Sequence, residues 1–290
     1  MGLIDDATLQ QGLNKLKAHD LYDDLDKYVY SRQAVFQERL AIEGGSARHG
    51  YNLALAHSNE NNELSAKAER LSLQFDQVLK VNNWLTFQLN TSITDRKGKS
   101  GKQSISSFGN SAGQVVPYAS LADENGLAVP LVRFLNQDYL FGLKGLPLLD
   151  WNYYPKEDYK YTKVQNHVRE LLISPTVIIK LPMGLEFQSK YNYQYQTSEN
   201  VTLNDQESFY TRDLINKFTQ IAKDGKVTYL VPMGAIRRSN IAGLHVHNVR
   251  NMLLLNRRLG IFELNGLAGM EIRNAVSESE GTIRYGFNEN

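Results

Sequence analysis

Two histidines at alternate positions are the first candidates for chemistry in this chain. His245 and His247 project from the same side of an extended segment, where both imidazoles could bind one metal ion. No carboxylate or third histidine accompanies them at a suitable spacing, and the chain contains no cysteine. A solvated strand or loop end therefore explains the pair better, and we expect no metal, no cofactor and no thiolate chemistry.

Charged residues give little support for catalysis. Glu207 and Asp213 lie close to Arg212 in the sequence, and helix capping and an exposed helix surface explain these charges. The glycine-rich segments lack the strand, lysine and helix that surround a phosphate-binding loop. We therefore expect that the protein is not an enzyme.

Aromatic residues in a long unpatterned segment give better support for binding. The cluster comprises Trp151, Tyr153, Tyr154 and Tyr159, with Asp150 and Asn152 among them. Sugar rings and peptides stack on aromatic side chains that have polar neighbours. Loop packing or an interface with a partner protein would use the same residues. We favour packing or an interface, and direct substrate contact is the alternative.

The elements that position these residues are predicted by one strongly alternating stretch, residues 181–196. Apolar and polar side chains alternate there, as on a β-strand with one apolar and one polar face. Aliphatic residues come first on the apolar face and tyrosines follow, an order that suits hydrocarbon and then lipid headgroups. The apolar positions are Leu181, Met183, Leu185, Phe187, Tyr191, Tyr193 and Tyr195. The strand of a soluble sandwich would also alternate.

Similar alternation elsewhere predicts an all-β chain of about nine antiparallel strands. The other segments are 34–45, 51–58, 71–79, 85–93, 164–179 with a break at Ser174-Pro175, 249–258, 260–275 and 281–288. Residues 3–31 have helical spacing and predict a short N-terminal helix. Short and long connections alternate along the chain, which is typical of an up-and-down outer-membrane barrel.

Domain boundaries follow from this pattern. We expect a helical lead-in over residues 1–32 and a segment of a transmembrane β-barrel over residues 33–290, with two long extracellular loops at 96–162 and 197–241. The formal net charge is +1, with 32 basic and 31 acidic residues, so no global field favours nucleic acid. The N-terminal stretch lacks a basic region followed by an apolar run, and we expect no signal peptide there.

Several stretches together resemble the SusC/RagA family of TonB-linked (TonB-dependent) outer-membrane transporters. They are "DDLDKYVYSRQAVFQERLAIEGGSARHGYNLALAHSNE", "PYASLADENGLAVP" with "LLDWNYYP", "SFYTRDLINKFTQIAKDGKVTYLVPMGAI" and "VRNMLLLNRRLGIFELNGLAGMEIR". The resemblance implies import of oligosaccharides or peptides across the bacterial cell outer membrane. It also implies a SusD-like surface lipoprotein as a lid, and the TonB system as a partner through a plug.

The family pattern is incomplete in this chain. We find no plug, no TonB-contacting segment and no closing aromatic strand, and a plugged barrel of this kind has roughly 22 strands. We therefore expect an internal barrel segment, from a gene fragment or a split transporter.

In a barrel, the two faces of the strands have different surroundings. The lumen-facing candidates are Gln188, Lys190, Asn192, Gln194 and Arg273, and the lipid-facing candidates are Leu181, Met183, Leu185, Phe187, Tyr191 and Tyr193. A soluble carbohydrate-binding or adhesive β-domain remains the alternative, in which the apolar face is a sandwich core.

Overall fold

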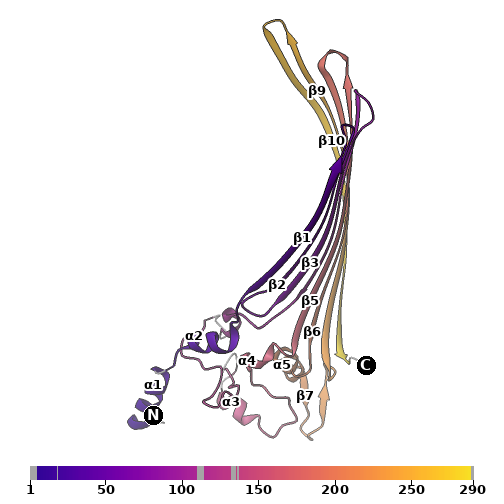
Figure 1. The fold of residues 1–290 in the computed structure, drawn as a ribbon. Coiled ribbons are helices and arrows are strands. Elements are labelled where there is room, and N and C mark those ends of the chain that lie inside the picture. Colours follow the sequence, from indigo (N-terminus) through magenta and orange to yellow (C-terminus); the bar gives the residue numbers. More distant parts are fainter. Residues whose placement is uncertain (1–4, 18, 110–113, 132–134, 136, 289–290) are drawn as a thin grey trace.

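One antiparallel sheet dominates the computed structural model, which describes residues 5–17, 19–109, 114–131, 135 and 137–288. The fold is all-β, and the sheet has eight strands in the order β1-β2-β3-β4-β5-β6-β9-β10. Every neighbouring pair is antiparallel, so the chain forms a meander that the structure leaves open (Figure 1). The strands are β1 (Ala34–Gly45), β2 (His49–Asn61), β3 (Lys67–Lys80), β4 (Leu85–Lys99), β5 (Thr162–Leu181), β6 (Leu185–Asn204), β9 (Ala235–Leu259) and β10 (Phe262–Phe287).

Helices lie before the sheet and within its two long connections. The lead-in contains α1 (Asp6–Lys17), α2 (Leu21–Asp24) and a π-helical turn, η1 (Leu25–Val29). The predicted continuous helix over 3–31 is therefore divided, and residues 3, 4 and 18 of that prediction lie outside the described residues. The connections contain η2 (Ile105–Phe108), α3 (Gln137–Gly142), α4 (Pro155–Asp158), α5 (Phe209–Lys217) and the hairpin of β7 (Thr219–Ile221) and β8 (Val227–Tyr229). No helix in the described part of the chain is long and apolar enough to cross a membrane.

Connection lengths are sorted between the two ends of the sheet. Residues 46–48, 81–84, 182–184 and 260–261 make short turns at one end, which we call the turn end. Residues 62–66, 100–161 and 205–234 connect strands at the other, the loop end. The lead-in before β1 and the last residues of β10 also lie at the loop end (Figure 1). The expected alternation of short and long connections is confirmed.

Three local predictions need correction. Residues 281–288 do not form a separate strand, because β10 runs without interruption to Phe287 and gives eight strands in the sheet. Pro175 does not break β5, since it lies opposite Leu89 of β4, and the ladder to β6 resumes at Thr176 in the same register. Residues 182–184 form the turn η3 between β5 and β6, where Met183 (φ 66°) and Gly184 (φ 79°) are both left-handed.

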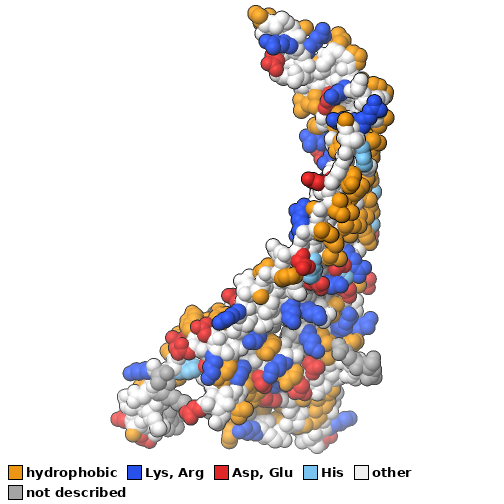
Figure 2. Space-filling view, in the orientation of Figure 1, with side chains coloured by type: hydrophobic (Ala, Val, Ile, Leu, Met, Phe, Trp, Pro, Cys, Tyr) orange, Lys and Arg blue, Asp and Glu red, His pale blue; other side chains and the backbone are white. Residues whose placement is uncertain are grey.

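The register places nearly all large apolar strand residues on one face of the sheet, the apolar face. One row of directly paired residues crosses all eight strands: Leu40, Leu55, Leu73, Ile93, Leu171, Tyr195, His245 and Val276. A row on the opposite face, the polar face, consists of Glu43, Asn52, Asp76, Asn90, Ser174, Asn192, Asn248 and Arg273. Apolar side chains form an extended stretch along the strands in Figure 2.

Burial shows which face is the more crowded. The buried strand residues are Ala54, Thr94, Ser174, Thr176, Asn204, Ile236 and Val246. All seven lie on the polar face. On the apolar face, by contrast, Leu40 is 66% exposed and Leu73 is 38% exposed. Since curvature of a sheet crowds the side chains on its inner side, we assign the polar face to the concave side of the curved sheet (Figure 1).

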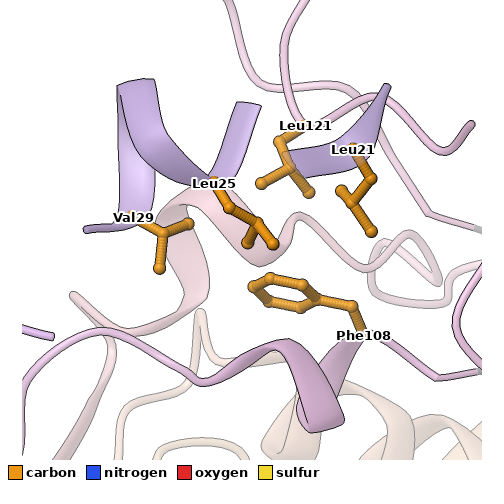
Figure 3. Close-up of a cluster of buried hydrophobic side chains, with 5 residues drawn as sticks. All are labelled: Leu21, Leu25, Val29, Phe108 and Leu121. Carbon is orange, nitrogen blue, oxygen red and sulfur yellow. The ribbon is translucent and has the colours of Figure 1, made fainter. Parts of the chain in front are cut away.

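A small hydrophobic core lies at the loop end and not within the sheet. Leu21, Leu25 and Val29 of the lead-in meet Phe108 and Leu121 of the first long connection, and all five are at most 3% exposed (Figure 3). The Leu21 N–H donates to the carbonyl of Pro117 at 2.8 Å, and the Leu121 N–H donates to the Asp24 carboxylate at 2.7 Å. The lead-in is thus fixed to the first long connection.

Candidate functional site

The two long connections dock on each other through helix α5. Ser208 caps this helix by accepting a hydrogen bond from the Thr211 N–H at 3.3 Å, and the cap fixes the helix start. Arg212, on the first turns of α5, is only 7% exposed. Its guanidinium donates to the carbonyl oxygens of Asp150 (2.7 Å), Asn152 (3.0 Å) and Glu207 (3.0 Å). One buried cation therefore holds the backbones of both connections.

Two further side chains complete this contact. The Asn216 amide donates to the Leu149 carbonyl and accepts from the Leu149 N–H, both at 2.8 Å. The buried Asp158 carboxylate accepts from the Phe209 N–H at 2.6 Å and from the Gln103 amide at 2.9 Å. We call residues 149–159 together with α5 the loop clamp. Arg212 was predicted to be an exposed helix charge, and this is wrong because carbonyl groups about sixty positions earlier surround it.

The loop clamp contains the predicted aromatic cluster, and its members differ in exposure. Tyr153 is 1% exposed, its ring lies 5.0 Å from that of Phe209, and its hydroxyl donates to Gln103. Tyr153 is therefore a packing residue in this structure. Trp151, Tyr154 and Tyr159 are half-buried and keep part of each side chain at the surface.

Trp151 lines a cavity of about 560 Å³ together with residues of the segment 140–149. Most of its lining is aliphatic or aromatic, including Leu140, Phe141 and Leu148. The polar lining residues are Lys144, Asp150 and Asn152. The indole N–H of Trp151 is buried and has no hydrogen-bond partner among the described residues. A buried donor without an acceptor costs free energy.

Tyr154 stands beside the charged part of the loop clamp. Burial raises the pKa of its hydroxyl above the ordinary value, and the Asp150 carboxylate raises it further. Asp150 also pairs with Arg212 at 3.2 Å, although its own side chain is 46% exposed. The hydroxyl of Tyr154 is therefore protonated at neutral pH and can donate a hydrogen bond at this surface.

Hydrogen bonds connect side chains of neighbouring strands on the polar face. The Asp76 carboxylate accepts from the amides of Asn90 (2.8 Å), Gln74 (2.8 Å) and Asn52 (3.4 Å). The Ser174 hydroxyl donates to Asn192 at 2.8 Å. Polar side chains thereby join β2, β3 and β4 to one another, and β5 to β6, in addition to the backbone hydrogen bonds.

The predicted lumen-facing residues share this polar face. They lie on β6 (Gln188, Lys190, Asn192, Gln194) and on β10 (Arg273). Asn192 and Arg273 both belong to the polar row, on either side of Asn248. The structure therefore brings Asn192 and Arg273 into one row of side chains.

Four of the six predicted lipid-facing residues lie on the apolar face of β6, and the other two lie outside β6. Leu185, Phe187, Tyr191 and Tyr193 alternate on β6 as expected. Leu181 is the last residue of β5, and Met183 lies in the turn η3 and not in a strand.

His245 and His247 also lie on the apolar face, beside the tyrosines of β6. The rings of Tyr195 and His245 are 4.7 Å apart, those of Tyr193 and His247 are 5.1 Å apart, and the Tyr191 hydroxyl lies 2.7 Å from His247 Nδ1. The two histidine rings of β9 thus continue the row of tyrosine rings on β6. No group of three His, Asp or Glu side chains within the described residues could hold a metal ion.

Comparison with known proteins finds similarity at the level of the fold. No protein-family model matches the chain, and no curated protein matches its sequence. A solved structure of the RagAB peptide transporter matches with a TM-score of 0.65 and 15% identity, over 94% of this chain and 28% of that one. The RagAB peptide importer matches in its 'closed-closed' state (TM-score 0.66, 14% identity, 92% and 27% covered) and in its 'open-open' state (0.64, 14%, 92% and 27%).

These neighbours are much longer than this chain, which spans little more than a quarter of their length. At this low identity the likeness concerns the fold alone. The chain has the fold of a segment of those transporter chains.

Proposed function

We propose that this chain forms part of the wall of a TonB-dependent transporter of the SusC-like class in the bacterial outer membrane. The observation that carries the proposal is the apolar face, which runs in register across all eight strands while the opposite, concave face is polar. Membrane barrels place apolar side chains toward lipid and polar side chains toward the lumen. A soluble sandwich would cover such a face with a second sheet, and the described residues contain none that does so.

The sorted connections support an orientation in the membrane. Bacterial outer-membrane barrels have short turns on the periplasmic side and longer loops outside the cell. The loop end, with the loop clamp, would therefore face the exterior, and the turn end the periplasm. Gln188, Lys190, Asn192, Gln194 and Arg273 would then line the lumen or contact a plug.

Oligosaccharides or peptides are the proposed substrates, with a SusD-like lipoprotein as a lid and TonB acting through a plug. The similarity in fold to the RagAB peptide transporter supports testing peptides first. Trp151, Tyr154 and Tyr159 are the proposed contacts for a substrate or lid, because each keeps part of its side chain at the surface. The proposal includes no catalytic step and no nucleic acid.

Cysteine labelling in cells tests the location and the orientation. The natural chain has no cysteine, so a single introduced thiol gives an unambiguous signal. We expect Lys223→Cys, in the exposed β7–β8 turn of the second long connection, to react with a membrane-impermeant maleimide on intact cells. Asn83→Cys, in an exposed turn at the turn end, should react only after the outer membrane is permeabilised.

Two outcomes would contradict this proposal. Equal labelling of both sites on intact cells would exclude the orientation. Recovery of the protein among soluble proteins after cell fractionation would exclude the membrane location and favour the soluble β-domain.

Substrate class is tested on the protein as extracted from its membrane, with any partners that copurify. Binding of fluorescent oligopeptides and of oligosaccharides is compared between the natural protein and Tyr159→Ala, with Tyr118→Ala as an exposed aromatic control outside the loop clamp. Weaker binding in Tyr159→Ala alone supports direct contact, and equal binding in both variants contradicts it.

A further inference from the structure

A basic cavity lies on the apolar face, close to the loop end of the sheet. Its volume is about 470 Å³, and it is formed over β4, β5, β6 and β9. Four cations line it, Lys97, Lys99, Lys163 and Arg237, against a single carboxylate, Glu199. This excess of positive charge contrasts with the whole chain, whose formal net charge is only +1.

Strand alternation places these cations on the apolar face. We call the row of large side chains on that face, which includes Leu73, Ile93 and Leu171, the apolar band. Each cation is an even number of residues from an apolar residue of the same strand, so both point to the same face. The pairs are Lys97 and Ile93 on β4, Lys163 and Leu171 on β5, and Arg237 and Val249 on β9. The register confirms that they converge, because Lys97 pairs with His167 and His167 with Glu199, while Arg237 pairs with Leu203 and Leu203 with Lys163. In Figure 2, charged side chains of both signs, including many Lys and Arg side chains, lie between the apolar stretch and the loop end.

The distance from the apolar band suits a lipid headgroup. Lys97 lies four residues beyond Ile93, which is about 14 Å along a strand and about 10 Å along the membrane normal for a strand tilted by about 45°. Lysine and arginine side chains can reach back toward the band along their aliphatic stems. Their charged groups would therefore meet the headgroup layer of the outer leaflet.

The lysines are available for an external anion. Lys97, Lys99 and Lys163 are exposed, and none of them forms an ion pair with a carboxylate in the part of the chain that the structure describes. Two further carboxylates lie near Lys97 on this face. Glu69 is opposite Lys97 in the strand register and lies 3.5 Å from His57, and Asp95 lies 2.8 Å from His167 and 3.7 Å from Arg169. Both carboxylates thus contact other side chains, and Glu199 is the only carboxylate among the residues that line the cavity.

We propose that this cavity binds the phosphorylated headgroup of an outer-leaflet lipid. Phosphate oxygens accept hydrogen bonds from several lysine and arginine donors at once, and the acyl chains of the lipid would lie on the apolar band below the cavity. The inference rests on the proposed membrane location, since only a lipid held against this face could make both contacts.

Lipid binding to the detergent-extracted protein tests the proposal, with dihexanoyl phosphatidic acid as the probe. The test variant is K97S/K99S/K163S, and the matched control is R39S/R70S/R238S, which removes three cations from the polar face. Each cation near an anionic lipid surface contributes roughly fivefold in affinity, so the test variant should bind about 100-fold more weakly. The control should keep the natural affinity.

A second variant keeps the test decisive if the triple variant does not fold. Glu199→Gln removes the single carboxylate of the cavity and should strengthen binding about fivefold. Equal affinity in the natural protein, the triple variant and Glu199→Gln would overturn the proposal. The proposal would also be overturned if inorganic phosphate displaced the lipid at concentrations similar to those at which the lipid binds. The site would then bind a free anion and not a lipid.

The membrane location is measured separately, so the two failures can be told apart. If labelling places the protein in the outer membrane but the charge variants bind lipid alike, only the lipid site is excluded. If the protein fractionates as soluble, both proposals fall.

Discussion

Arg212 should decide whether the two long connections move together or separately. In Arg212→Ala, three carbonyl oxygens lose their donor, two in the segment 150–152 and one at Glu207. The side chain is 7% exposed, so water does not replace these bonds without opening the structure. We expect the loop clamp to open far more often.

The magnitude follows from the bonds that are lost. Each hydrogen bond from a charged donor contributes about 1.5–3 kcal/mol, but bonds that share one side chain are not additive. The ion pair with Asp150 adds little because that carboxylate is 46% exposed and screened by solvent. A loss of about 3 kcal/mol therefore raises the opening equilibrium by about 100-fold.

Hydrogen exchange followed by mass spectrometry measures this opening in the protein extracted from its membrane. Amides of residues 149–158 should exchange about 100-fold faster in Arg212→Ala, while amides in the middle of β3 should be unaffected. The control is Asp213→Asn on the same helix, which loses only an i,i+4 ion pair with Lys217 and should change exchange less than about threefold. Equal exchange in the two variants would refute the role of Arg212.

Three further substitutions test other parts of the structure. Leu73→Arg on the apolar face should destabilise the protein in lipid by about 2–4 kcal/mol in urea titration, and the adjacent Ser72→Arg on the polar face should cost much less; equal costs would contradict the assignment of faces. Asp76→Ala should lower stability by about 1–3 kcal/mol because three amides lose their acceptor, and an unchanged thermal midpoint would show that water replaces it. Trp151→Phe should leave the free energy of unfolding unchanged or raise it by about 1 kcal/mol, because the lost N–H has no partner within the described residues. A loss of stability above about 2 kcal/mol would mean that this N–H has a hydrogen-bond partner in the working protein.

Strand alternation predicted the sheet well because side chains on a strand repeat every two residues whatever lies around them. The alternation from Leu185 onward belongs to β6 as expected. The error at Leu181 to Gly184 has a simple cause, since the apolar residues of the turn continue the same spacing by coincidence. Pro182 and Gly184 were the available turn signal.

Tertiary contacts of the loop clamp could not be predicted in this way. Arg212 contacts carbonyls 60 and 62 residues earlier, and no local spacing encodes a contact of that range. The basic cavity was missed for a related reason, because its cations come from three strands and are scattered in the sequence. Only the strand register brings them together.

The loop clamp also limits how such a protein could be re-engineered. Surface loops are usually exchanged one at a time between related scaffolds, on the assumption that each folds by itself. Here the first connection depends on Arg212 and Asn216 of the second for its backbone hydrogen bonds. Natural substitutions at these positions should be accompanied by changes around residues 149–152, and a graft that carries over the first connection should carry α5 with it.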